Sequence, residues 1–152
     1  MKVSPFLKEE RIILELKART KEEAIKEIAY LLKNAPEIIN FDGFLNDIFE
    51  REKIGSTGIG KEIAIPHART DNVKEFVIAI GRCKEGIEFQ AMDKKPVKLI
   101  FLMGTPKEEG LDEYLKILAH LTRLIDKNSF RSSLFSAKTA KEVIDIFKSV
   151  EE

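Results

Sequence analysis

The chain has 152 residues, of which 43% are hydrophobic and 34% charged, enough apolar material for one folded core. Its 26 Lys and Arg residues balance 26 Asp and Glu residues, so it lacks the overall positive charge typical of nucleic-acid-binding domains. The single cysteine, Cys83, excludes an internal disulfide, and no apolar run approaches the roughly 20 residues that span a bilayer. The N-terminus lacks a signal-peptide pattern. We therefore expect one domain over residues 1–152 in a cytoplasmic protein that reaches a membrane only through a partner.

The first half of the chain contains one predicted strand and two predicted helices. Thr20 and Glu23 have the spacing of a capping box, which marks the start of the first helix. Apolar residues recur at helical spacing in both helices, so each helix has one buried face. In chain order we expect a strand at 11–16, a helix at 21–34, a helix at 41–53, a glycine-rich break at 55–60 and an extended segment at 63–65.

The second half begins with strands and ends with helices. The run at 97–103 is apolar at almost every position, which predicts a strand buried on both faces. Cys83 shares a strand face with other small residues, so we interpret it as buried and not as a nucleophile. This order of elements predicts an α/β single-domain sandwich with a mixed parallel and antiparallel sheet flanked by helices. The expected elements are strands at 75–83, near 87–89 and at 97–103, and helices at 111–126, 129–136 and 140–149.

The glycine-rich break resembles a nucleotide-binding loop, since Gly55, Gly60 and Lys61 have the spacing of the P-loop motif. That motif requires Ser or Thr next, to bind magnesium, whereas this chain has the anionic Glu62. The segment also follows a helix and enters an extended piece, so no helix N-terminus is available for phosphate. A nucleotide-binding enzyme is therefore the weakest hypothesis for this chain.

His67 is a better candidate for chemistry. Neutral imidazole has a free lone pair and a pKa of about 6.5, so it accepts a phosphoryl group near neutral pH. Pro66 fixes its own backbone angle and restricts Ile65 to extended geometry, so the histidine is held firmly. Guanidinium and hydroxyl groups that stabilise a phosphoryl group in transfer are available nearby. These groups belong to Arg51, Arg69, Ser56 and Thr57.

The same residues also have ordinary interpretations. His67 can be a loop histidine without a chemical role, and Arg51 can be a solvated charge at a helix end. Tyr114 can be a core residue with its hydroxyl at the edge. Two histidines without cysteines or carboxylates at ligand spacing argue against a zinc site. From the residues alone, these alternatives stay open.

A larger pattern resembles the enzyme IIA domain of the fructose/mannitol type from the sugar phosphotransferase system, including its nitrogen-regulatory relatives. The resemblance rests on Arg51-Glu52-Lys53, Ser56-Thr57-Gly58-Ile59-Gly60 and Ile63-Ala64-Ile65-Pro66-His67. Further segments at 20–25, 87–97 and 113–118 match in the same order, and the resemblance covers residues 8–149.

The resemblance implies a mixed sheet flanked by helices and no metal or organic cofactor. His67 matches the phosphorylated histidine, which carries the phosphoryl group on Nε2 while the other ring nitrogen is hydrogen-bonded. It would accept the group from the carrier HPr, or its nitrogen-branch equivalent, and pass it to a cysteine of a IIB domain. Arg51 matches the arginine that supports the phosphoryl group. No nucleic acid is implied as a partner.

The chain departs from the family at Tyr114, where members usually carry a second active-site histidine. A tyrosine still donates a hydrogen bond but stays neutral near pH 7. His120 does not replace it, because helical geometry turns it about 120° away, beside Glu113, and we expect it on the surface.

Two roles fit the resemblance. In the first, the protein carries phosphate to a sugar transporter. In the second, it is a regulatory module of the nitrogen branch, and the charge added at His67 switches binding to a target protein. No IIB or IIC sequence is fused to this chain, which mildly favours the regulatory role but excludes neither.

Overall fold

The computed structural model describes residues 2–151, apart from the side chain of Glu109. Within this range, a first strand and two helices are followed by the remaining strands and then by three helices, the order that the sequence predicts. Three short 3-10 helices are η1 (Ser4–Phe6), η2 (Glu9–Arg11) and η3 (Lys107–Glu109). The α-helices are α1 (Lys21–Tyr30), α2 (Phe41–Ile54), α3 (Gly110–Ile125), α4 (Asn128–Ser136) and α5 (Ala140–Glu151). The strands are β1 (Ile12–Ile13), β2 (Gly58–Gly60), β3 (Ile63–Ala64), β4 (His67–Thr70), β5 (Val77–Ile87) and β6 (Val97–Pro106).

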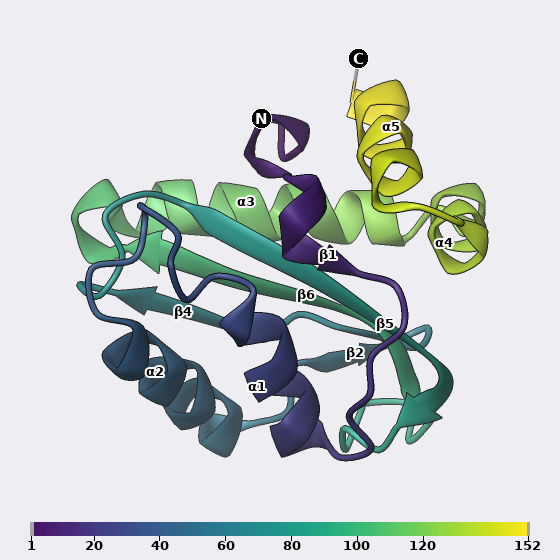
Figure 1. Cartoon of the computed structure of the whole chain (residues 1–152), viewed down its shortest axis with the longest axis horizontal. Helices are drawn as coiled ribbons and strands as arrows, with labels where there is room; N and C mark the ends of the chain where they lie inside the picture. The colour runs from purple at the N-terminus through teal and green to yellow at the C-terminus, as the bar shows by residue number, and fades with distance from the viewer. Residues whose placement is uncertain (1, 152) are drawn as a thin grey trace.

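The six strands form one mixed sheet in the order β1-β5-β6-β3-β2, with β4 also paired to β6. β5 and β6 are antiparallel, whereas β3 and β4 run parallel to β6 along its other edge. Helices α1 and α2 cover one face of the sheet, and α3, α4 and α5 lie on the other (Figure 1). Both ends of the described chain lie on the α3–α5 side. The expected fold, a mixed sheet between helical layers, is confirmed.

The sheet separates two apolar cores. The first contains the buried faces of α1 and α2 against one side of β5 and β6, and Cys83 is buried within it, as expected. The second lies between the opposite side of the sheet and the last three helices. β6 contributes side chains to both cores, so the run at 97–103 is buried on both faces, as its composition predicts.

Several boundaries differ from the predictions. The first strand is only Ile12–Ile13; beyond it the carbonyl of Leu14 accepts a hydrogen bond from the Arg82 side chain (3.3 Å), and the Leu16 backbone N–H donates to the Arg82 carbonyl (2.9 Å). α1 ends at Tyr30, since the next residues form tighter bonds to the residue three positions back. The segment near 87–89 is not a separate strand, because β5 runs through Ile87 and ends there.

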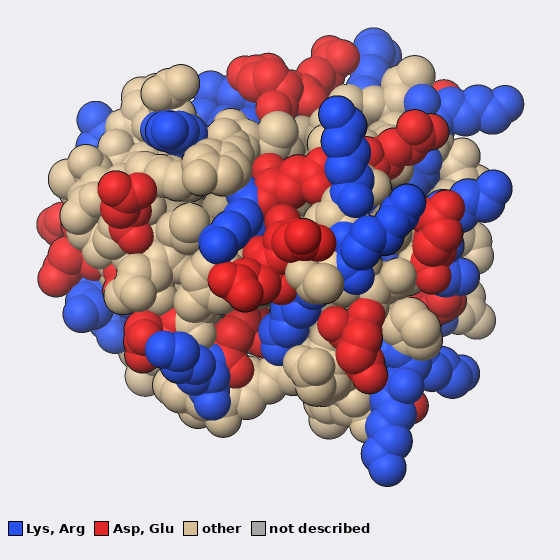
Figure 2. All heavy atoms as spheres, turned by 60° about the horizontal axis from the view of Figure 1, so that its bottom comes forward, with Lys and Arg blue, Asp and Glu red and all other residues tan. Residues whose placement is uncertain are grey.

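Surface charge is mixed on the side of the molecule that carries α1 and α2. In Figure 2 the acidic and basic side chains alternate over most of this face, while a region at its left is largely uncharged. This agrees with a net charge of zero. Among the helices within residues 2–151, none has the length and apolar character needed to cross a membrane.

Candidate functional site

His67 begins β4, directly after Pro66, at a point where the backbone is held on β6. The carbonyl of Pro66 accepts a hydrogen bond from the Met103 backbone N–H (2.9 Å), and His67 lies opposite Met103 in the parallel ladder. Pro66 predicts extended geometry for Ile65, the residue before it, and His67, directly after it, is the first residue of β4. The histidine is presented by a strand in the sheet and not by a free loop.

The His67 ring is locked in one orientation. Its side chain is buried, with the residue only 6% exposed, and Nδ1 lies 2.7 Å from the carbonyl oxygen of Ile65. Because a carbonyl only accepts, Nδ1 must carry the proton, and in the neutral ring Nε2 then keeps a free lone pair. Burial lowers the pKa of His67, and the positive charge of Arg51 lowers it further, against the opposing effects of Ile65 and Glu52. The ring is thus a neutral nucleophile near pH 7.

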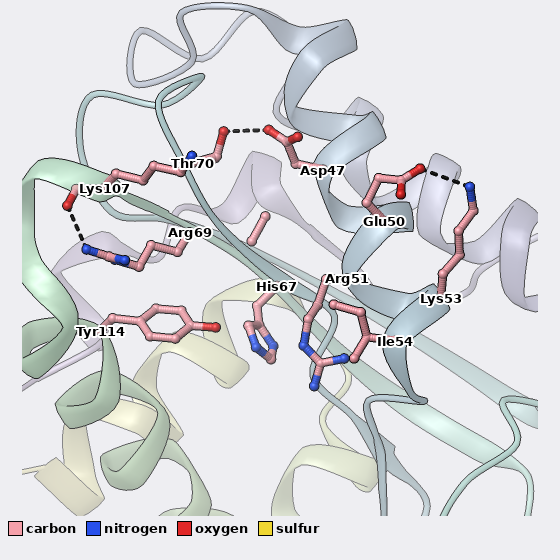
Figure 3. Close-up of a pocket in the computed structure, with 11 residues that line it drawn as sticks. Asp47, Glu50, Arg51, Lys53, Ile54, His67, Arg69, Thr70, Lys107 and Tyr114 are labelled. Atoms are coloured by element: carbon pink, nitrogen blue, oxygen red, sulfur yellow. Dashed lines mark hydrogen bonds and ion pairs between the residues drawn. The ribbon is translucent and has the colours of Figure 1, made fainter.

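His67 opens onto a pocket of about 500 Å³ between α2, β4, η3 and the start of α3. Figure 3 shows the histidine at its centre, with Tyr114 on one side and Arg51 on the other. The pocket therefore brings together all three predicted site residues, which are separated widely in the sequence. Its full lining is Asp47, Glu50, Arg51, Lys53, Ile54, His67, Ala68, Arg69, Thr70, Lys107 and Tyr114.

Arg51 lies in the last turn of α2, and its guanidinium group stands beside the His67 ring (Figure 3). One of its nitrogens, Nη1, donates a hydrogen bond to the carbonyl of Gly55 (2.8 Å), which holds the side chain in place. A planar guanidinium anchored by one nitrogen keeps other donors for an anion at the histidine. The arrangement supports the predicted role of Arg51.

Tyr114 faces His67 from the first turns of α3. The two ring centroids are 5.6 Å apart with an angle of 52° between the planes, and the hydroxyl points toward the histidine (Figure 3). Burial raises the pKa of Tyr114, although Arg51 and Arg69 act in the opposite direction. The tyrosine is therefore a neutral hydrogen-bond donor at physiological pH.

The remaining predicted anion contacts divide into two groups. Arg69 lines the pocket, where its Nη2 donates to the Lys107 carbonyl (3.0 Å) and its buried Nε has no hydrogen-bond partner. By contrast, the Ser56 hydroxyl donates to the carbonyl of Phe89 (2.5 Å), and the Thr57 hydroxyl donates to Glu52. Neither hydroxyl lines the pocket, so the prediction that Ser56 and Thr57 contact an anion together with the arginines was wrong.

Sequence reasoning missed the support that surrounds the pocket. Asp47 accepts hydrogen bonds from the Thr70 hydroxyl (2.5 Å) and from the Asn72 side chain (2.8 Å), which ties α2 to β4. Lys107 contributes through its carbonyl, a group that no side-chain motif reveals. Only the helical spacing in the sequence could have indicated that Asp47 faces the pocket, because it lies four residues before Arg51 and therefore on the same face of α2.

The glycine-rich segment does not form a nucleotide-binding loop. β2 and β3 form a tight hairpin, with Lys61 and Glu62 at its turn and both at positive φ (59° and 68°). The Lys61 ammonium pairs with Asp126 (2.7 Å), and the Glu62 carboxylate pairs with Lys98 (3.0 Å). No helix begins at this segment, so it lacks the helix N-terminus that binds phosphate in a P-loop.

His120 lies elsewhere than predicted. Its side chain is only 13% exposed, and its Nε2 is 2.6 Å from a carboxylate oxygen of Glu151 in α5. The same carboxylate accepts the backbone N–H groups of Val3 and Ser4 (2.7 and 2.9 Å). The expectation of a surface histidine beside Glu113 was wrong, because α5 and the N-terminal segment cover that side of α3. His120 does not line the pocket, in agreement with the prediction that it does not replace Tyr114.

Known proteins resemble the chain over nearly its whole length. A fructose-specific EIIA component of the phosphotransferase system from Haloferax volcanii is 38% identical over 143 residues, covering 94% of this chain and 92% of the relative. The crystal structure of the nitrogen regulatory protein IIA-Ntr from Neisseria meningitidis superimposes with a TM-score of 0.87 at 34% identity, covering 95% of this chain and 97% of the other.

A third comparison concerns the fold alone. The complex of enzyme IIAMTL and phosphorylated enzyme IIBMTL from Escherichia coli matches with a TM-score of 0.80 at 24% identity, over 94% of this chain and 97% of the other. The family model for EIIA 2 of the phosphoenolpyruvate-dependent sugar phosphotransferase system matches residues 5–150. With 38% identity to one member over most of both chains, the protein belongs to this EIIA 2 family.

Proposed function

We propose that the protein is a phosphoryl carrier that accepts its phosphoryl group on Nε2 of His67 from phosphorylated HPr. In this step the Nε2 lone pair attacks the phosphorus atom. The bond between phosphorus and the donor histidine breaks, and its electron pair returns to the donor ring. No proton has to leave Nε2, because the neutral tautomer carries its proton on Nδ1.

The observation that carries this proposal is the hydrogen bond from Nδ1 of His67 to the carbonyl of Ile65. It leaves the nucleophilic nitrogen as the only free ring nitrogen, in a pocket that also holds Arg51. Once a phosphoryl group is attached, Nδ1 keeps its proton and its partner. Arg51 then supplies charge-assisted donors to the phosphoryl oxygens, which stabilises both the loaded state and the transfer.

In the onward step, a cysteine thiolate of a IIB domain would attack the phosphorus atom. The P–N bond breaks, and its electrons return to Nε2 as the lone pair. The relative from Haloferax volcanii is fructose-specific, and a IIA protein of the same fold is known in complex with phosphorylated IIB. These likenesses support a IIB partner and sugar uptake.

A regulatory role is the second candidate. The high structural similarity to IIA-Ntr supports it, since that protein is named a nitrogen regulatory protein. In this role the loaded His67 would add about one net negative charge to the pocket, because the phosphoryl oxygens are dianionic while the ring keeps its Nδ1 proton, and this would alter binding to a target protein. Both candidate functions use the same chemistry at His67. They differ in the partner, which is either a IIB domain that accepts the phosphoryl group or a target protein whose binding depends on it.

Both bond changes occur between protein side chains, so the proposal includes no metal or organic cofactor. We place the protein in the cytoplasm, where the phosphoenolpyruvate donor and HPr act, and treat residues 1–152 as one enzyme IIA type-2 domain. Contact with a membrane would come only through a transporter partner.

The test is incubation with phosphoenolpyruvate, enzyme I and HPr, followed by intact-mass measurement. We expect one acid-labile phosphate per chain, abolished in His67→Gln and His67→Ala. The chain has only two histidines, so His120→Ala is the matched control and should still be labelled. Full labelling of folded His67→Gln would overturn the assignment.

Purified fructose-type IIB then separates the two roles. Rapid transfer from loaded protein to the IIB cysteine supports sugar transport. Loading by HPr without any transfer to IIB supports the regulatory role.

A further inference from the structure

Glu52 is a buried acid directly behind the site, and it makes no contact with the pocket itself. Its side chain is only 5% exposed. The carboxylate accepts hydrogen bonds from the backbone N–H of Thr57 (3.2 and 3.3 Å) and from the Thr57 hydroxyl. Glu52 therefore holds Thr57 in place, at the start of the segment 57–67 that ends at His67.

From Thr57 a continuous set of hydrogen bonds leads to the catalytic ring. The carbonyl of Thr57 accepts the backbone N–H of Ile65 (3.0 Å), and the carbonyl of Ile65 accepts Nδ1–H of His67 (2.7 Å). Two hydrogen-bonded backbone groups thus connect the carboxylate to the imidazole. The position of the Ile65 carbonyl depends on where Thr57 is held.

Lys21 supplies the counter-charge. Its ammonium lies 2.7 Å from a Glu52 carboxylate oxygen and 4.7 Å from the centre of the Phe89 ring. The carbonyl of Phe89 also accepts the Ser56 hydroxyl, next to Thr57 in the chain. A buried carboxylate with three donors is held in one position, because each donor replaces a hydrogen bond to water.

We propose that Glu52 is a positioning residue, which acts through Thr57 to hold the Ile65 carbonyl and so selects the Nδ1–H tautomer of His67. The hydrogen bonds from Thr57 to Glu52 matter for transfer, because the tautomer that they favour is the one with the lone pair on Nε2. The effect on transfer rests on the proposed function, whereas the effect on the tautomer does not.

A purely structural role is the alternative. Glu52 and Lys21 join α2 to α1, so their loss would lower stability wherever the pair lay in the molecule. Glu37 provides a matched comparison, because its carboxylate also pairs with a buried cation, Arg11, at 2.8 and 2.9 Å. That pair has no hydrogen bond to the segment 56–67.

The experiment compares Glu52→Gln, Thr57→Val and Thr57→Ser with Glu37→Gln and wild type. Each protein is labelled with ¹⁵N-histidine, and long-range ¹H–¹⁵N spectra report which ring nitrogen of His67 carries the proton. Far-ultraviolet circular dichroism confirms that each variant is folded. Transfer from phosphorylated HPr is measured as kcat and KM on the same samples.

We expect wild type and Glu37→Gln to show the Nδ1–H tautomer. In Glu52→Gln and Thr57→Val the Nε2–H population should rise severalfold, and kcat should fall roughly tenfold at similar KM. Thr57→Ser keeps the hydroxyl and should restore both values. If folded Glu52→Gln and Thr57→Val retain the wild-type tautomer, the proposal is wrong.

The two proposals fail separately. If HPr does not load the wild-type protein, the proposed function is lost, while the spectra still decide whether Glu52 and Thr57 set the tautomer.

Discussion

The centroid of the Tyr114 ring lies 5.6 Å from the centroid of the His67 ring. Its hydroxyl is a neutral donor, and a hydrogen bond of this kind contributes about 0.5–1.5 kcal/mol. We therefore predict that Tyr114→Phe changes the rate of transfer from HPr less than tenfold. Quench-flow measurement with phosphorylated HPr tests this, and a loss as large as that of His67→Ala would contradict it.

Arg51 carries more of the charge at the site. Removing its charge-assisted hydrogen bond should slow transfer by about 1.5–3 kcal/mol, or about 10- to 150-fold. Arg51→Ala should therefore lose more activity than Tyr114→Phe in the same assay. Arg51→Lys should restore only part of the rate, because lysine lacks the planar fork that keeps one donor on Gly55. A wild-type rate in Arg51→Ala would make this residue a solvated charge.

The pKa of His67 should lie below that of an exposed histidine. Burial lowers its pKa, so its NMR midpoint should lie below the value of about 6.5 for an exposed imidazole. Because the unfolded chain binds the proton more readily, the group destabilises the fold as pH falls from about 6.5 toward the folded pKa. Transfer should be insensitive to His67 titration above pH 6.5 and should decline below the measured midpoint. A midpoint above 6.5 would contradict the described environment.

His120 and Glu151 should matter for stability and not for transfer. His120→Ala leaves a buried carboxylate without one of its donors, so the free energy of unfolding should fall by about 1–3 kcal/mol. The transfer rate, measured at a temperature where the variant is folded, should stay within twofold of wild type. A transfer defect equal to that of His67→Ala would mean that α3 is misplaced.

The same contact predicts a pH dependence. Burial raises the pKa of Glu151, but hydrogen bonds from Val3, His120 and Ser4 outweigh it and leave the pKa below its usual value. The stabilisation is present above the unfolded pKa of about 4.3 and is lost as pH falls through the folded pKa. Denaturation curves should show a smaller acid loss in Glu151→Gln than in wild type.

The turn between β2 and β3 is a site for stabilisation. Glu62 has φ of 68°, and a left-handed conformation costs a residue other than glycine roughly 1–2 kcal/mol. Glycine adds unfolded-state entropy of about 0.5–1 kcal/mol, and the half-exposed pair with Lys98 contributes little. Glu62→Gly should therefore raise the free energy of unfolding by about 0.5–1 kcal/mol in chemical denaturation. Glu75→Gly, at ordinary φ in another exposed loop, should lower it.

Much of the site follows from local sequence rules. Pro66 predicts extended geometry for Ile65, and the run at 97–103 predicts the buried strand to which β4 is paired. The family and the fold were identified from the motif around His67, and the comparisons confirm them. The roles of His67, Arg51 and Tyr114 stay predictions.

The features of the site that local sequence rules do not predict depend on contacts between separate segments of the chain. His120 meets Glu151 from another helix, 31 residues away, and no periodicity within α3 reveals that partner. Thr57 looked like a free hydroxyl near the histidine, but a carboxylate five residues earlier occupies it. The first strand is shorter than predicted, and the carbonyl of Leu14 beyond its end accepts a hydrogen bond from the Arg82 side chain of the neighbouring strand, a contact that no local pattern reveals.

The attachment of β4 to β6 has a consequence for how such a protein communicates. His67 begins a strand whose backbone is bonded to β6, a long and almost fully buried strand of the sheet, so a group added to its ring has no mobile segment to displace. The loaded and unloaded forms should then share one backbone. A partner would distinguish them by the electrostatic potential at the pocket mouth, and the message would be carried as charge and not as shape.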